Sequence, residues 1–120
     1  MFRLKYFTFE EFDSPDQKGS GESMNKDFLK KLDKARKGAV VPFVITSGFR
    51  TKEHNKKVGG VKNSSHLKGL ACDIRVRSDY ERFQIAAALI HEGFNRIGIS
   101  KTFIHVDNDE NKNSERLWLY

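Results

Sequence analysis

The stretch SSHLKGLACDIRV, residues 64–76, decides how this chain is interpreted, because it places His66 and Asp73 on either side of a turn. Gly69 allows the backbone to turn tightly between them. Residues 70–76 have the composition of a strand, with apolar side chains at alternate positions. These alternate residues are Cys72, Ile74 and Val76. Because side chains alternate across a strand, they are predicted to face the core, and Asp73 is predicted to face the other side.

A second short strand, FIHVD at residues 103–107, has the same division into two faces. Phe103, His105 and Asp107 share one face, and Ile104 and Val106 share the opposite one. If the two strands are neighbours, His66, Asp73 and His105 converge. Two imidazoles and one carboxylate suit Zn²⁺, with a fourth tetrahedral position left for water. The spacing alone leaves a simpler interpretation open, in which His66 is a solvated histidine before a strand.

The rest of the chain predicts an α+β fold in which helices come early and strands come late. Helices are expected to begin near Thr8, Met24, Thr51 and Ser78, each with a capping or periodicity signal. Strands are expected over residues 40–46, 70–76, 96–100, 103–107 and 116–120. We therefore expect a single domain over residues 1–120, with a largely antiparallel sheet flanked by short helices. Trp118 and Tyr120 have two alternative places, in a substrate groove or in the core, and we predict that they pack into the core as part of the terminal strand.

Composition excludes several classes of protein. The 120 residues contain ten Phe and are 38% hydrophobic, which supports one folded core and argues against disorder. No run of about 18 apolar residues predicts a membrane span. The net charge of +6 favours polyanionic partners. The basic residues are scattered, so no nucleic-acid partner is predicted. Cys72 is the only cysteine, which rules out a thiolate zinc cluster.

The sequence resembles the zinc D-Ala-D-Ala carboxypeptidase and L-alanyl-D-glutamate endopeptidase family, the M15 peptidases, at four places. These are TSGFR at residues 46–50, the loop at residues 55–64, SSHLKGLACD at residues 64–73 and FIHVD at residues 103–107. The opening YFTFEEF, residues 6–12, is also similar to the single-domain members. The resemblance implies a hedgehog-like zinc fold, a Zn²⁺ cofactor and the metal ligands His66, Asp73 and His105. It also implies that Arg50 stabilises the tetrahedral intermediate or grips a substrate carboxylate.

The sequence departs from the family at the general base. Many members carry an acidic residue three positions before the last histidine ligand, where this chain has Thr102. Asp107 is the substitute that we consider, either as the catalytic base or as an acceptor that orients His105. The two roles stay open at this point.

The function that the resemblance implies is zinc-dependent hydrolysis of a peptidoglycan stem peptide or cross-link by a monomer. The alternative is a catalytically impaired, zinc-stabilised module that binds the cell wall. Residues 1–12 lack the apolar run of a signal peptide. We therefore expect a phage or prophage lysis enzyme, made in the cytoplasm and released to the wall, or a hydrolase carried on a virion. The sequence does not distinguish among the peptide bonds that such enzymes cut.

Overall fold

Five strands form one sheet in the order β1-β2-β4-β3-β5 in the computed structural model, which describes residues 2–120. The strands are β1 (Ile45–Ser47), β2 (Ala71–Arg75), β3 (Arg96–Ile99), β4 (Phe103–Asp107) and β5 (Arg116–Leu119). All neighbours pair antiparallel except β3 and β5, which are parallel. The predicted α+β class is confirmed, and the parallel pair makes the largely antiparallel sheet a mixed one.

Three α-helices surround the sheet, and each begins at a side-chain cap. They are α1 (Lys26–Gly38), α2 (Lys52–Lys57) and α3 (Asp79–His91). The side chains of Asn25, Thr51 and Ser78 accept hydrogen bonds from backbone N–H groups in the first turns. Each bond satisfies a donor that the helix itself cannot pair. Three short 3-10 helices, η1 (Phe9–Phe12), η2 (Ser20–Ser23) and η3 (Ser65–Lys68), complete the chain.

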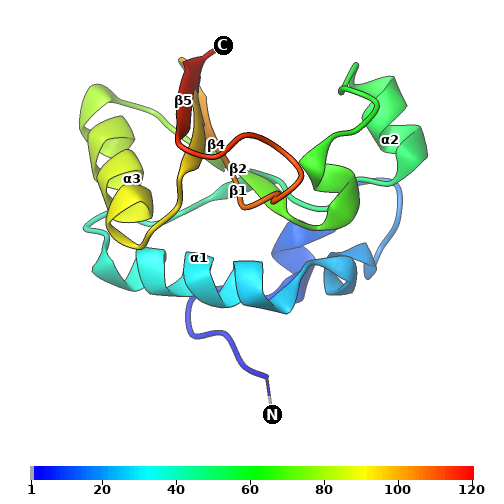
Figure 1. Cartoon of the computed structure of the whole chain (residues 1–120). Coiled ribbons are helices and arrows are strands. Elements are labelled where there is room, and N and C mark those ends of the chain that lie inside the picture. The colour runs from blue at the N-terminus through cyan, green and yellow to red at the C-terminus, as the bar shows by residue number, and fades with distance from the viewer. Residues whose placement is uncertain (1) are drawn as a thin grey trace.

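The hydrophobic core lies between one face of the sheet and the two long helices. In Figure 1, α1 runs beneath the strands and α3 stands beside them, while α2 lies on the opposite side of the strands from α3. The sheet residues of this core include Cys72, Ile74, Ile97, Ile104 and Val106. Phe28, Leu29 and Leu32 of α1 and Ile85 and Leu89 of α3 pack against them. The predicted alternation on β2 and β4 is confirmed, so the polar residues of both strands occupy the other face.

The predicted strand at residues 40–46 is shorter than expected, because only Ile45–Ser47 pairs with the sheet. Pro42 lacks the N–H that a strand ladder needs, and it precedes the paired segment. Part of the expected polar loop at residues 61–68 is helical, since Ser65–Lys68 forms η3. Among residues 2–120, no helix combines the length and apolar character required to cross a membrane.

Candidate metal centre

Three polar side chains meet on the sheet face that the core leaves free. Asp73 on β2 lies directly opposite His105 on β4, and η3 brings His66 beside them. Asp73 Oδ1 lies 3.0 Å from His105 Nδ1 and 3.3 Å from His66 Nε2. One ligand atom from each residue lies within 4.8 Å of the other two, and all three residues are buried. Two imidazole nitrogens and one carboxylate oxygen are a donor set that fits Zn²⁺. The structure brings the three predicted ligands together, and metal binding by them stays a prediction.

His66 is held so that one ring nitrogen points at this centre. Its Nδ1 lies 2.7 Å from the carbonyl oxygen of Gly48. Because a carbonyl can only accept, Nδ1 carries the hydrogen and donates it, and the lone pair of the neutral ring lies on Nε2. That lone pair faces Asp73. A backbone acceptor of this kind fixes the tautomer of a metal-binding histidine.

Gly69 sets the path of the chain between His66 and Asp73. It ends η3 with a positive φ of 70°, which favours glycine. A Cβ at this position would lie 2.5 Å from the carbonyl oxygen of Ser23. The backbone N–H of Asn25 donates to the Gly69 carbonyl at 2.9 Å. The turn that positions His66 is therefore packed against the residues just before α1, so closely that residue 69 has no room for a side chain.

Asp107 lies on the far side of the His105 ring from Asp73. Its Oδ2 is 2.8 Å from His105 Nε2, and its Oδ1 accepts from Arg96 Nε at 2.7 Å and from the Asp109 backbone N–H at 3.1 Å. When Nε2–H donates to Asp107, the His105 lone pair lies on Nδ1, toward Asp73. Asp107 is 1% exposed, and both of its oxygens are occupied. This geometry favours the orienting role over the role of catalytic base.

Electrostatics keep the carboxylates of this group ionised. Burial would raise the pKa of Asp73, but its contacts with His105 and His66 hold it well below its ordinary value. The pKa of Asp107 is likewise lowered, because hydrogen bonds from His105 and Arg96 outweigh burial. Burial would lower the pKa of His105, but its two carboxylate partners raise it. The centre without metal therefore favours a proton on His105 between two anions, and a metal cation would replace that proton.

Arg50 enters the same cleft from the segment after β1. Its Nη2 lies 3.6 Å from Asp73 Oδ2. Ser47 Oγ accepts from Arg50 Nε at 3.1 Å, and Asn55 Oδ1 accepts from Nη1 at 3.2 Å. These two bonds hold the guanidinium beside the candidate metal centre, and the role of Arg50 toward a substrate stays a prediction.

Residues 5–107 match the family model described as peptidase M15. This chain belongs to the M15 peptidase family. The match contains all three candidate ligands and Arg50, so the sequence resemblance is confirmed.

No curated protein matches this M15 peptidase, but a solved structure does. It is the crystal structure of the Serratia marcescens L-Ala D-Glu endopeptidase ChiX, which is 22% identical, with a TM-score of 0.49. The similarity covers 59% of this chain and 62% of the ChiX chain.

The cleft of this M15 peptidase contains residues that sequence analysis placed elsewhere. It has a volume of about 420 Å³, and Trp118 and Tyr120 line it together with the candidate ligands. The prediction that these two rings pack into the core is wrong, and the alternative place, lining a groove, is the one that the structure shows. The strand β5 lies at the edge of the sheet beside β3. The Trp118 ring lies on the same face of the sheet as His105.

Asp109 is a further buried residue that sequence analysis missed. Its Oδ2 accepts from Ser65 Oγ at 2.8 Å and from Lys68 Nζ at 2.9 Å. Because Ser65 precedes His66, this carboxylate ties the loop of one candidate ligand to the end of β4. The only signal in the sequence is that Asp109 follows Asp107 by two residues after a strand.

Thr102, at the family's usual acid position, lies outside the cleft. It is exposed in the turn before β4, and its carbonyl accepts from the Val76 backbone N–H at 2.8 Å. The acidic residues that line the cleft are Asp73 and Asp107.

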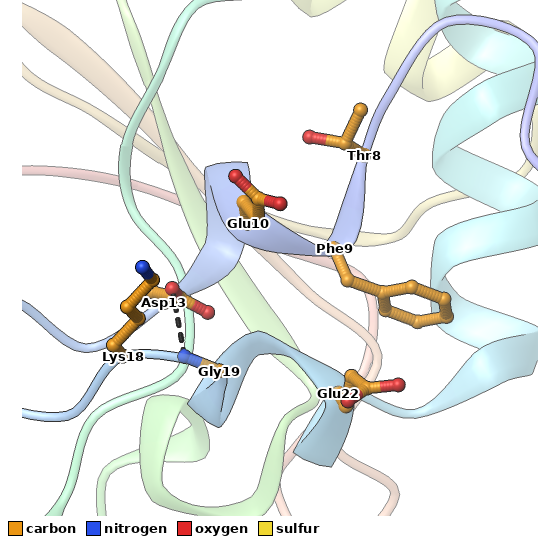
Figure 2. A pocket seen from close by; sticks show the side chains of 7 residues that line it. All are labelled: Thr8, Phe9, Glu10, Asp13, Lys18, Gly19 and Glu22. Atoms are coloured by element: carbon orange, nitrogen blue, oxygen red, sulfur yellow. Dashed lines mark hydrogen bonds between the residues drawn. The ribbon is translucent and has the colours of Figure 1, made fainter.

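A second cleft of about the same volume lies at the N-terminal segment, far along the chain from these ligands (Figure 2). Its lining residues are Thr8, Phe9, Glu10, Asp13, Lys18, Gly19 and Glu22. The Asp13 carboxylate accepts from the backbone N–H groups of Gly19 and Gly21 at 3.0 and 2.7 Å, and these bonds lower its pKa. Asp13 therefore holds a loop together. Among the residues that the structure describes, this lining has no histidine or cysteine, so the His-Asp-His cleft is the candidate active site.

Proposed function

We propose that this M15 peptidase hydrolyses an amide bond in the peptide of bacterial peptidoglycan, with residues 1–120 acting as one zinc peptidase domain. The observation that carries the proposal is the buried group of His66, Asp73 and His105 on the floor of a cleft. These residues would hold the zinc through Nε2, a carboxylate oxygen and Nδ1. When bound, zinc polarises a scissile carbonyl and makes a coordinated water acidic enough to react near neutral pH.

Arg50 acts on the substrate in this proposal. Two of its nitrogens are held by Ser47 and Asn55, which leaves Nη2 on the side of Asp73 and the cleft. A fixed guanidinium stabilises negative charge that develops on the carbonyl oxygen, or it pairs with a carboxylate of the peptide. For either role, the Arg50 guanidinium must already be oriented toward the cleft before the substrate binds, as it is here.

Asp107 acts through His105. It receives the Nε2 hydrogen and so keeps the Nδ1 lone pair directed at the metal position. Arg96 holds the carboxylate on its other oxygen. We assign Asp107 as a positioning residue and not as the base.

Within residues 2–120, neither carboxylate that lines the cleft is free to act as a base, and this favours a second candidate function. Of the two lining carboxylates, Asp73 is a candidate ligand and Asp107 has both oxygens engaged. A zinc-stabilised module that binds peptidoglycan without cutting it fits this observation.

Mass spectrometry of purified muropeptides tests the two functions against each other. The zinc-loaded protein is incubated with muropeptides, and His66→Ala protein treated in the same way is the control. New peptide termini made only by the wild-type protein support hydrolysis and identify the bond that is cut. Muropeptides that stay intact, together with retention of the protein on sacculi, would support the binding module instead.

A further inference from the structure

Three aromatic side chains form one side of the cleft. The ring centroid of Trp118 lies 5.6 Å from that of His105 and 6.3 Å from that of Tyr120. Tyr120 in turn lies 5.2 Å from Phe103. Tyr120 is 67% exposed, so its ring offers apolar surface to a ligand beside the candidate metal centre. We call Phe103, Trp118 and Tyr120 the aromatic wall.

Gly98 makes room for this wall. On β3 it lies opposite His105 on β4 and opposite Trp118 on β5. A Cβ at Gly98 would be 2.6 Å from Trp118 Nε1 and 2.6 Å from Tyr120 Cε2, closer than packed atoms approach. The two rings therefore lie over the backbone of β3, next to His105, because residue 98 has no side chain.

Arg96 fixes the wall to the metal centre. Its guanidinium carbon lies 5.0 Å from the Trp118 ring centroid, within the range of a cation–π contact. The same side chain donates to Asp107. One arginine thus holds both the indole and the carboxylate that orients His105.

A second apolar surface faces the cleft from the turn after α2. Val58 and Val61 line the cleft and are exposed, with Gly59 and Gly60 between them. The cleft therefore has apolar side chains at two places on its rim and a polar floor of His66, Asp73 and His105. An extended peptide whose reacting amide lies on the floor would place its side chains against these surfaces.

We infer that the aromatic wall is a specificity subsite, which binds an apolar side chain of the residue next to the scissile bond. This inference rests on the proposed peptidase function and deepens it. Trp118 contacts His105 ring to ring, so its distance from the metal centre suits the residue adjacent to the reacting amide. The rings offer apolar surface, and an apolar side chain that packs against them gains about 25 cal/mol for each Å² removed from water. Trp118 belongs to β5 and Tyr120 directly follows it. Both residues lie beyond residues 5–107, which match the family model.

The test uses Trp118 as its own reporter, because it is the only tryptophan of the chain. The zinc-loaded protein is titrated with two probes: the isolated stem peptide, and the peptidoglycan disaccharide without its peptide. We expect the stem peptide to change the Trp118 fluorescence and the disaccharide to leave it unchanged. A response to the disaccharide alone would assign the wall to sugar and overturn the inference.

Kinetics with muropeptides then separate the wall from the chemistry. Tyr120→Ala removes one ring, and Gly98→Ala displaces two rings without removing either. Loss of one well-placed aromatic contact should raise KM about tenfold and leave kcat within about twofold. Leu119→Ala is the matched control, because Leu119 lies on the other face of β5 and is 80% exposed. Zinc content is measured for each variant, and if Gly98→Ala protein fails to fold, Tyr120→Ala carries the test.

The outcomes distinguish the inference from the function on which it rests. Raised KM in the wall variants, with zinc content intact and Leu119→Ala normal, supports the wall. If the wild-type protein cleaves muropeptides and the wall variants have the same KM as Leu119→Ala, the wall is not a subsite. The peptidase function then still holds. A Trp118 response to the stem peptide without cleavage supports the wall and refutes hydrolysis. If the protein neither binds the stem peptide nor cleaves muropeptides, both the aromatic wall as a subsite and the peptidase function are overturned.

Discussion

Replacement of Asp107 by asparagine separates an orienting carboxylate from a catalytic base. Asparagine keeps the shape but offers one acceptor oxygen instead of two. Arg96 carries a permanent charge and needs an acceptor, so the amide oxygen is expected to face Arg96 and the NH₂ group to face His105. His105 Nε2 must then accept, which moves its hydrogen to Nδ1 and removes the lone pair directed at the metal position.

The expected loss is in metal affinity. Changing the partner that orients a histidine ligand typically costs 10- to 100-fold in affinity, about 1.4–2.7 kcal/mol. The metal-free protein should also lose about 1–1.5 kcal/mol of stability, because the charge-assisted hydrogen bond between His105 and a buried carboxylate is replaced by a neutral one, which is roughly half as strong. Zinc affinity is measured by competition with a chromophoric chelator, and stability by urea unfolding of the metal-free protein.

Glu110→Gln is the matched control for Asp107→Asn. It removes the same charge from an exposed residue three positions along the chain, outside the cleft. We expect its zinc affinity to equal that of the wild type. The orienting role would be refuted if Asp107→Asn bound zinc as tightly as this control while turnover fell about 100-fold or more, since that pattern belongs to a lost base.

Three other predictions follow from buried groups. Asp109→Ala leaves Ser65 and Lys68 without their acceptor, so urea unfolding should show a loss of about 1–3 kcal/mol, and no loss would contradict the bridge. Cys72→Ala should cost roughly 1 kcal/mol and keep its zinc, because the thiol is buried on the core face; zinc loss in a folded protein would mean that the face is misassigned. The raised pKa of His105 means that its proton stabilises the metal-free fold fully below the ordinary histidine pKa of about 6.5, and this contribution is lost as pH rises through the raised value. The melting temperature of metal-free protein should fall over that interval, and a His105→Gln variant should not show this fall.

The site was predictable because two short strands have unambiguous faces. On β2 and β4, apolar residues alternate with Asp73, His105 and Asp107, and burial of the apolar set leaves only one face for the polar set. Gly69 marks the turn that returns the chain to β2. The same pattern therefore gives both the strand and the residues that converge beside it.

Alternation fails on β5, where both faces carry large apolar residues. Leu117 and Leu119 lie on one side and Trp118 on the other, so hydropathy does not say which side faces the cleft. The parallel pairing of β5 with β3 is also a long-range contact, which no local pattern encodes. The role of Asp107 depends on which atoms meet across the His105 ring, and spacing along the strand does not contain that information.

The central claim is that His66, Asp73 and His105 hold one zinc ion, and metal analysis of purified protein tests it most directly. Wild-type, His66→Ala and Asp73→Ala proteins are loaded with zinc, dialysed and measured by plasma mass spectrometry, with circular dichroism to verify folding. We predict one zinc per wild-type chain and strongly reduced zinc in both variants. Full zinc occupancy in folded His66→Ala and Asp73→Ala proteins would contradict the account.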